Sequence, residues 1–235
     1  MATFVLVPGA WYGGWCWRRV APRLRAAGHE VYTPTLTGLG ERAHLLSREI
    51  GVQTHVQDLL GVLTYEDLSA VTVVAHTYGA MIATVAAEHA AHRLAHLVFV
   101  DGLVPADGQS LLECLGPRAT AFWLEQARTG GDGWKLPPHA AEDMDIPDEA
   151  DRRWLDATLT PHPLRTYQER IRLAGAAAAA LPRTHISCTL EQGPLMGAAA
   201  ARARAAGWGY RELASGSHAM ITAPRELTEL LLDLV

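Results

Sequence analysis

The sequence predicts an α/β fold with a mostly parallel central sheet flanked by helices. Short runs rich in Val and bounded by Gly or Pro alternate with longer stretches whose apolar residues recur at helical spacing. One run, Val71 to Ala75, contains only Val, Thr and Ala, which is typical of a central strand covered on both faces. With 235 residues, 49% of them hydrophobic, the chain is long enough for one domain with a large core.

The expected elements alternate in the first part of the chain and again near its end. Pro8-Gly9 closes the first strand, Pro34 closes the second, and Gly28 stops the helix between them. The expected strands are Thr3 to Val7, Val31 to Thr33, Val71 to Ala75, Leu97 to Val100, Ile186 to Cys188 and Trp208 to Leu213. The expected helices lie around Val20 to Ala27, Val52 to Leu63 and Met81 to Ala91, and from Pro224 onward.

The alternation stops between Pro105 and Leu181, where helical fragments, a loop (Thr129 to Pro138) and an acidic stretch replace it. We therefore expect a core made of residues 1–104 and 182–235, with a helical cap inserted as residues 105–181. Aromatic residues in this insertion are candidates for lining an apolar substrate pocket, although such residues also serve as ordinary packing. They are Phe122, Trp123, Trp134 and Trp154.

Composition excludes several classes of protein. The 20 Lys and Arg against 25 Asp and Glu give a formal charge of -5, which offers no long-range attraction for a nucleic acid backbone. The sequence shows no signal leader and no apolar run of about 18 residues, so we expect neither secretion nor a membrane span. The 3 cysteines are too scattered for a disulfide framework or a metal site, which fits a reducing cytoplasm.

The segment Ala75-His76-Thr77-Tyr78-Gly79-Ala80 follows the most buried strand and leads into a helix. This is the context of a nucleophile elbow, G-x-S-x-G, with Thr77 at the position of the serine. Small residues at the ends of the motif let strand and helix approach closely. Ala75 in place of the first glycine is a small departure from the motif, and Thr77 in place of serine is a larger one. β-branched residues resist the strained backbone of an elbow, and the added methyl group crowds the hydroxyl.

Two further segments complete a candidate catalytic set. His218 lies in a loop of small residues between the last strand and the final helix, after the nucleophile in chain order. The first strand ends in Pro8-Gly9-Ala10-Trp11, where we expect the backbone N-H of Ala10 to form an oxyanion hole with the N-H of Tyr78. Trp11 is a further candidate for substrate contact.

With these motifs in place, the sequence resembles the α/β-hydrolase superfamily, in particular small bacterial esterases related to plant methylesterases and hydroxynitrile lyases. The opening Phe4 to Trp17 and the segment Thr35 to Arg42 carry the resemblance alongside the elbow. It implies an α/β-hydrolase fold and an acid after the strand before the last one, where Glu191 stands. Asp101, after the strand that follows the elbow helix, is the alternative acid.

The functional expectation is hydrolysis of an ester, lactone or related acyl bond by Thr77, His218 and one of these two acids. An alternative is a lyase, cyclase or isomerase acting on a carbonyl compound, in which His218 is the general acid or base and Thr77 positions the substrate. A binding protein without catalysis is the third possibility. No motif for a nucleotide, flavin or metal is present, so we expect no cofactor and a small, apolar or aromatic substrate as the partner.

Overall fold

The computed structural model describes residues 1–190 and 194–235 and is built around one six-stranded sheet. The strand order is β2-β1-β3-β4-β7-β8, and each of its pairings is parallel. The strands are β1 (Thr3–Val7), β2 (Glu30–Tyr32), β3 (Val71–His76), β4 (Leu94–Val100), β7 (Arg183–Cys188) and β8 (Gly209–Leu213). The α/β class and the parallel central sheet predicted from the sequence are therefore confirmed.

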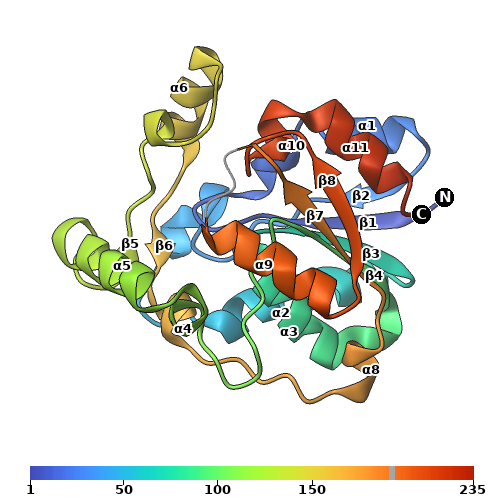
Figure 1. Ribbon diagram of the computed structural model, residues 1–235, viewed down its shortest axis with the longest axis horizontal. Coiled ribbons are helices and arrows are strands. Elements are labelled where there is room, and N and C mark those ends of the chain that lie inside the picture. Colours follow the sequence, from blue (N-terminus) through green and yellow to red (C-terminus); the bar gives the residue numbers. More distant parts are fainter. Residues whose placement is uncertain (191–193) are drawn as a thin grey trace.

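Helices cover both faces of the sheet (Figure 1). On one face lie α1 (Ala21–Ala26), α10 (Ala219–Thr222) and α11 (Pro224–Leu232), and on the other lie α2 (Val52–Tyr65), α3 (Tyr78–Ala90) and α9 (Pro194–Ala205). Successive side chains of a strand point to opposite faces, so β1 sends Val5 and Val7 into the α2 and α3 side and Phe4 and Leu6 into the α1 side. All four are fully buried.

Element boundaries differ from the sequence prediction by a few residues. β4 begins at Leu94 rather than at Leu97, because Leu94 pairs with Val71 across an irregularity in the register. Helix α3 begins at Tyr78 rather than at Met81, directly after Thr77. Within the described ranges, no helix combines the length and hydropathy that crossing a bilayer requires.

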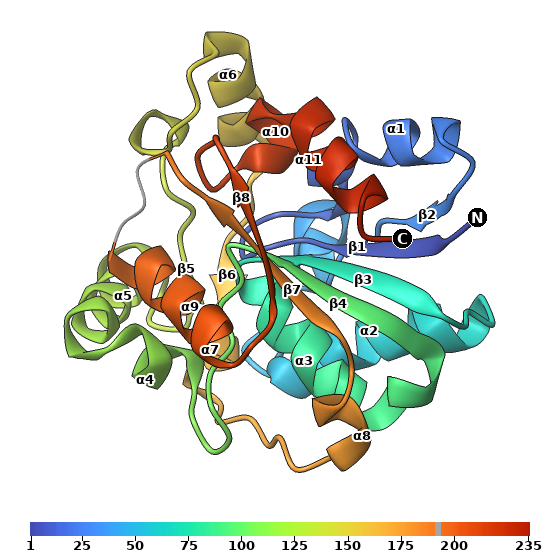
Figure 2. The same ribbon diagram turned by 45° about the vertical axis from the view of Figure 1, so that its right-hand side comes forward.

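The residues between β4 and β7 add short elements, most of which lie to the left of the sheet in Figure 2. We call residues 101–182 the intervening segment. The expected loop from Thr129 to Pro138 is only partly a loop, because a helix runs to Gly130 and Lys135–Leu136 pairs with His162–Pro163 in an antiparallel ladder. The division into a core and a helical cap with the predicted boundaries stays a prediction. The segment contains α4 (Leu111–Leu115), α5 (Pro117–Gly130), β5 (Lys135–Leu136), α6 (Glu149–Thr158), β6 (His162–Pro163), α7 (Arg165–Gln168), α8 (Ala176–Ala179) and the 3-10 turn η4 (Ala141–Asp143).

Candidate active site

The candidate site lies where the strand order reverses. The chain passes from β1 to β2 at one edge and then returns to pair β3 with the other side of β1. Loops that leave the carboxyl ends of two such strands diverge, and the crevice between them is the usual place for a ligand in a parallel sheet. Here Gly9, Ala10 and Trp11 follow β1, and Thr77 follows β3.

Thr77 has the backbone of a nucleophile elbow. Its φ of 41° and ψ of -109° are unusual for a β-branched residue. Hydrogen bonds over-determine this conformation, since the Thr77 N-H donates to Val100 O at 3.1 Å and the Thr77 carbonyl accepts from Ala80 and Leu103, each at 3.1 Å. A Cβ on Gly79 would come within 2.6 Å of Pro8 O, so the small residue of the motif lets α3 approach β1.

Gly9 leaves room for the side chain of Thr77. A Cβ on Gly9 would lie 2.5 Å from Thr77 Oγ1 and 2.6 Å from His76 Nδ1. Both atoms therefore face the turn after β1. A side chain larger than hydrogen at Gly9 has to displace the hydroxyl or the imidazole.

Two histidines, His76 and His218, line the same cavity as Thr77. His218 follows β8 at the start of α10, and the rings of His76 and His218 have centroids 6.1 Å apart. His76 Nε2 donates to the carbonyl of Ser217 at 3.0 Å, which ties the loop that carries His218 to the elbow. Burial lowers the pKa of His218 to about 4, with Asp145 opposing this shift and His139 adding to it. Burial, with a smaller effect of His218, lowers the pKa of His76 to about 3. Both rings are thus neutral at pH 7.

Of the two candidate acids, the structure describes only Asp101. Asp101 is 1% exposed, accepts a hydrogen bond from Cys188 N at 3.0 Å and is also hydrogen bonded to Ser217, the neighbour of His218. Burial raises the pKa of Asp101, and these hydrogen bonds oppose the rise. Glu191 lies outside the described residues. Among the described residues, the buried Nδ1 of His218 has no hydrogen-bond partner.

The two amides predicted for the oxyanion hole are available for a ligand. Ala10 follows β1, and Tyr78 is the first residue of α3, where backbone N-H groups have no acceptor within the helix. In the part of the chain that the structure describes, neither N-H donates a hydrogen bond. Both residues line the cavity described next.

A cavity of about 300 Å³ brings most of the predicted residues together. Ala10, Trp11, Thr77, Tyr78, Trp123 and His218 all line it. Of the remaining aromatic candidates, Phe122 is 46% exposed and packs on Trp123 with ring centroids 5.0 Å apart, outside the lining. Trp134, with Arg48 and Lys135 each 5.5 Å from its ring centroid, does not line the cavity either. Trp154 also lies outside the lining, and its ring packs 5.0 Å from that of Trp15.

Sequence reasoning missed several lining residues. Tyr12 is 2% exposed, and its ring lies 5.9 Å from that of His218. Tyr12 belongs to the opening segment Phe4 to Trp17, which the sequence placed near the site. The sequence did not indicate where this side chain points. The intervening segment contributes more residues that carried no local signal, because they reach the site from far along the chain. They are Leu103, Leu115, His139, Asp143, Met144, Asp145 and Tyr167.

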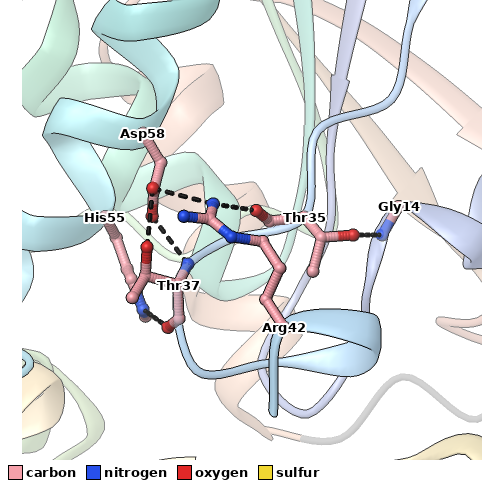
Figure 3. Close-up of polar contacts among 6 residues, drawn as sticks. All are labelled: Gly14, Thr35, Thr37, Arg42, His55 and Asp58. Atoms are coloured by element: carbon pink, nitrogen blue, oxygen red, sulfur yellow. Dashed lines mark hydrogen bonds and ion pairs between the residues drawn. The ribbon is translucent and has the colours of Figure 1, made fainter. Parts of the chain in front are cut away.

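A buried chain of hydrogen bonds supports Tyr78 from the core. His55 Nε2 donates to Thr37 O at 2.9 Å, so His55 Nδ1 accepts from the Tyr78 hydroxyl at 2.7 Å. Thr37 is fixed in turn by Asp58, which accepts from its N-H at 2.6 Å and from its hydroxyl at 2.7 Å, and Arg42 pairs with Asp58 at 2.9 Å (Figure 3). This network fixes the side chain of Tyr78, the residue whose backbone N-H is one of the two expected oxyanion donors.

The site has the residues of acyl-transfer chemistry rather than those of a metal centre. Among the described residues, no three His, Cys, Asp or Glu side chains lie close enough together to hold a metal ion. Thr77 with its hydroxyl, His218 with a neutral imidazole, and Ala10 and Tyr78, whose N-H groups donate no hydrogen bond among the described residues, line one cavity. Such a set can attack a carbonyl carbon, accept a proton and stabilise an oxyanion.

Comparisons with known proteins identify the family of the chain. A family model described as "Alpha/beta hydrolase family" matches residues 4–230. A carbendazim hydrolyzing esterase from Nocardioides sp. (strain SG-4G) is 38% identical over 242 aligned positions, which cover 100% of both chains. Methylesterase 7 of Arabidopsis thaliana is 35% identical over 104 positions, which are 43% of this chain and 40% of that protein.

Solved structures show the same fold. An extracellular α/β-hydrolase from a Paenibacillus species, described as a structural and functional homologue of tobacco salicylic acid binding protein 2, superposes with a TM-score of 0.86. It is 22% identical and covers 99% of this chain and 98% of its own. A tomato methylketone synthase I variant complexed with beta-ketoheptanoate gives 0.85 at 20% identity, over 99% and 97% of the two chains. The chain therefore belongs to the α/β-hydrolase family and is an esterase-like enzyme.

Proposed function

We propose that the chain hydrolyses an ester, lactone or related acyl bond of a small, largely apolar molecule, with Thr77 as the nucleophile. The observation that carries the proposal is the meeting of Thr77, His218 and the amides of Ala10 and Tyr78 on one cavity of about 300 Å³. The relative named for hydrolysing carbendazim, which matches over its full length, supports an ester-cleaving activity.

In this mechanism Thr77 Oγ1 attacks the carbonyl carbon while its proton passes to His218. The carbonyl oxygen becomes an oxyanion and accepts hydrogen bonds from the N-H groups of Ala10 and Tyr78. Collapse of the intermediate breaks the acyl bond, and the leaving alcohol takes the proton from His218. Water, activated by His218, then attacks the acyl group on Thr77 and releases the acid.

The acid that orients His218 is proposed to be Glu191, with Asp101 as the alternative. The contacts of Asp101 support Glu191 as the first choice, because the Asp101 carboxylate is hydrogen bonded to Cys188 and Ser217. Among the described residues, Asp101 therefore reaches Ser217, the neighbour of His218, and the Nδ1 of His218 has no partner. A carboxylate at His218 would stabilise the imidazolium that forms on proton uptake.

The substrate is proposed to be apolar or aromatic because of the cavity wall. The rings of Trp11 and Trp123 lie 5.3 Å apart, and the ring of Tyr167 lies 6.1 Å from that of Trp123. Leu103 and Leu115 continue the same wall. The intervening segment, which supplies Trp123, Tyr167 and Leu115, is proposed to act as the cap over this pocket.

Hydrolysis of 4-nitrophenyl esters tests the proposal. We expect Thr77→Val, which removes only the hydroxyl, to lose about a hundredfold or more in rate, and His218→Asn to lose a comparable factor. We expect Thr77→Ser to gain about tenfold because the crowding methyl group is gone. Thr64→Val, an exposed position of α2, is the matched control. If Thr77→Val hydrolyses esters as fast as the control, Thr77 is not the nucleophile.

One observation favours a second candidate. A β-branched residue at φ 41° is a poor choice for an attacking group, whereas a hydrogen bond from the same hydroxyl to a substrate needs no such attack. In that case the enzyme is a lyase, cyclase or isomerase acting on a carbonyl compound, with His218 as general acid or base. Thr77→Ser would then leave turnover almost unchanged, and no acyl group would form on Thr77.

A further inference from the structure

Two aspartates give the cavity wall a negative charge. Asp143 and Asp145 both line the cavity, and no Lys or Arg side chain is among its described lining residues. Neither aspartate pairs with a basic side chain within residues 1–190 and 194–235. The three lining histidines do not offset this charge, because burial lowers the pKa of each of them, to about 3 at His76 and about 4 at His218.

The third lining histidine, His139, places the aspartates relative to the aromatic wall. Its ring lies 5.5 Å from that of Trp11 and 5.1 Å from that of Trp123. The pKa of His139 and that of His218 are both lowered by burial; Asp143 opposes the shift of His139 and Asp145 that of His218, so each carboxylate lies near one of these two rings.

A buried histidine adds a second, independent acceptor. His76 is 2% exposed, and because its Nε2 donates to Ser217 O, its Nδ1 carries a lone pair. Among the described residues this buried Nδ1 has no hydrogen-bond partner. His76 lines the same cavity, and its Nδ1 is covered by the turn at Gly9. A buried acceptor without a donor is costly, so a ligand N-H group that reached this atom on binding would gain a hydrogen bond.

We propose that this cavity selects ligands that combine an aromatic or apolar body with a basic nitrogen or several N-H donors, and that it disfavours anionic ligands. The body packs on Trp11 and Trp123, whose ring faces also attract a cation. The nitrogen lies towards Asp143 and Asp145. This inference extends the proposed function, since it assumes that the same cavity receives the substrate, and it names esters of nitrogenous compounds as the substrate class.

Equilibrium binding tests the inference without requiring turnover. The probes are 4-phenylbutylamine, 4-phenylbutyrate and the neutral 4-phenylbutanol, which share one phenylbutyl body. We expect the amine to bind about tenfold more tightly than the carboxylate at low salt, as two partly exposed charges allow, and the difference to shrink at high salt. Isothermal titration calorimetry near neutral pH measures all three affinities.

Variants identify the residues responsible. We expect Asp143→Asn combined with Asp145→Asn to abolish the preference for the amine while keeping the affinity for phenylbutanol, which shows that the cavity is intact. Glu142→Gln is the matched control, because Glu142 is an exposed acid beside Asp143 that does not line the cavity. It should keep the full preference.

Equal or tighter binding of the carboxylate, or a preference that survives the double substitution, overturns the inference. The outcome is separable from the proposed function. If the amine is preferred but no ester is hydrolysed, the hydrolase proposal fails alone. If esters are hydrolysed through Thr77 without any preference for charge, only the inference about ligand charge fails.

Discussion

Thr77 combines a reactive position with an unfavourable residue type. Its positive φ is held by three hydrogen bonds of the surrounding backbone, so the strain is imposed by the fold rather than relieved by the side chain. The hydroxyl group of Thr77 and the imidazole of His76 share the small space in front of Gly9. The hydroxyl can therefore keep its position only while residue 9 has no side chain.

Gly9→Ala tests this dependence. The new Cβ would overlap Thr77 Oγ1 at 2.5 Å and His76 Nδ1 at 2.6 Å, both far inside van der Waals contact. We expect ester hydrolysis to fall by about a hundredfold or more, since small displacements of a reacting group carry such penalties. Steady-state kinetics measures the loss. Gly61→Ala, an α2 position where a Cβ meets nothing within 4 Å, is the control. Full activity in Gly9→Ala would show that the hydroxyl does not act from this position.

At the residue scale, local motifs of the sequence pointed to residues that line one cavity in the structure. Thr77, Ala10 and Tyr78 lie next to strand ends, and strand ends can be read from the Val-rich runs. Direction was harder to predict. Phe122 and Trp123 are adjacent on α5 and so point to different sides of the helix, and only Trp123 reaches the cavity. Nothing in their spacing distinguishes the two.

At the scale of elements, the sequence predicted the six strands of the central sheet and the helices α1, α2, α3 and α11, but it placed no helix where α9 lies. It did not predict how the intervening segment is attached. Helix α6 is joined to the core by Asp151, which is 8% exposed and accepts two hydrogen bonds from Arg19, at 2.5 and 2.7 Å. These partners are 132 positions apart. Nothing in the sequence distinguishes Asp151 from the other acidic residues of its stretch as the partner of Arg19.

Asp151→Asn is expected to loosen α6. The substitution leaves Arg19 partly buried without its carboxylate, which costs about 1–3 kcal/mol. Amide hydrogen exchange followed by mass spectrometry should show faster exchange across Glu149–Thr158, while the central sheet keeps its protection. Arg153→Gln is the control, because its contact with Glu149 is 3.7 Å long and exposed on both sides. Unchanged exchange in Asp151→Asn would mean that the pair does not hold α6 in place.

At the scale of the whole molecule, buried neutral histidines make stability depend on pH. Burial lowers the pKa of His55 to about 4 and that of His76 to about 3, against about 6.5 in the unfolded chain. Between these values the unfolded state binds more protons than the folded state. The stability that these histidines contribute is therefore complete above pH about 6.5 and is lost as the pH falls towards 4.

Urea unfolding measured between pH about 7 and about 5 tests this expectation. Each such histidine should lower the free energy of unfolding by up to about 1.4 kcal/mol per pH unit in the acidic part of the range. His55→Asn should reduce the slope, whereas His92→Gln, at an exposed position, should leave it unchanged. A free energy that stays constant over the range would contradict the neutral, buried state of these rings.

The central claim is that a threonine hydroxyl at the elbow attacks the substrate. Labelling the intact enzyme with a fluorophosphonate and locating the adduct by peptide mass spectrometry tests it most directly. We expect one adduct, on Thr77, which is lost in Thr77→Val and strongly slowed in His218→Asn. An adduct on Ser217, which lines the same cavity, or no adduct on an enzyme that hydrolyses esters, would contradict the account.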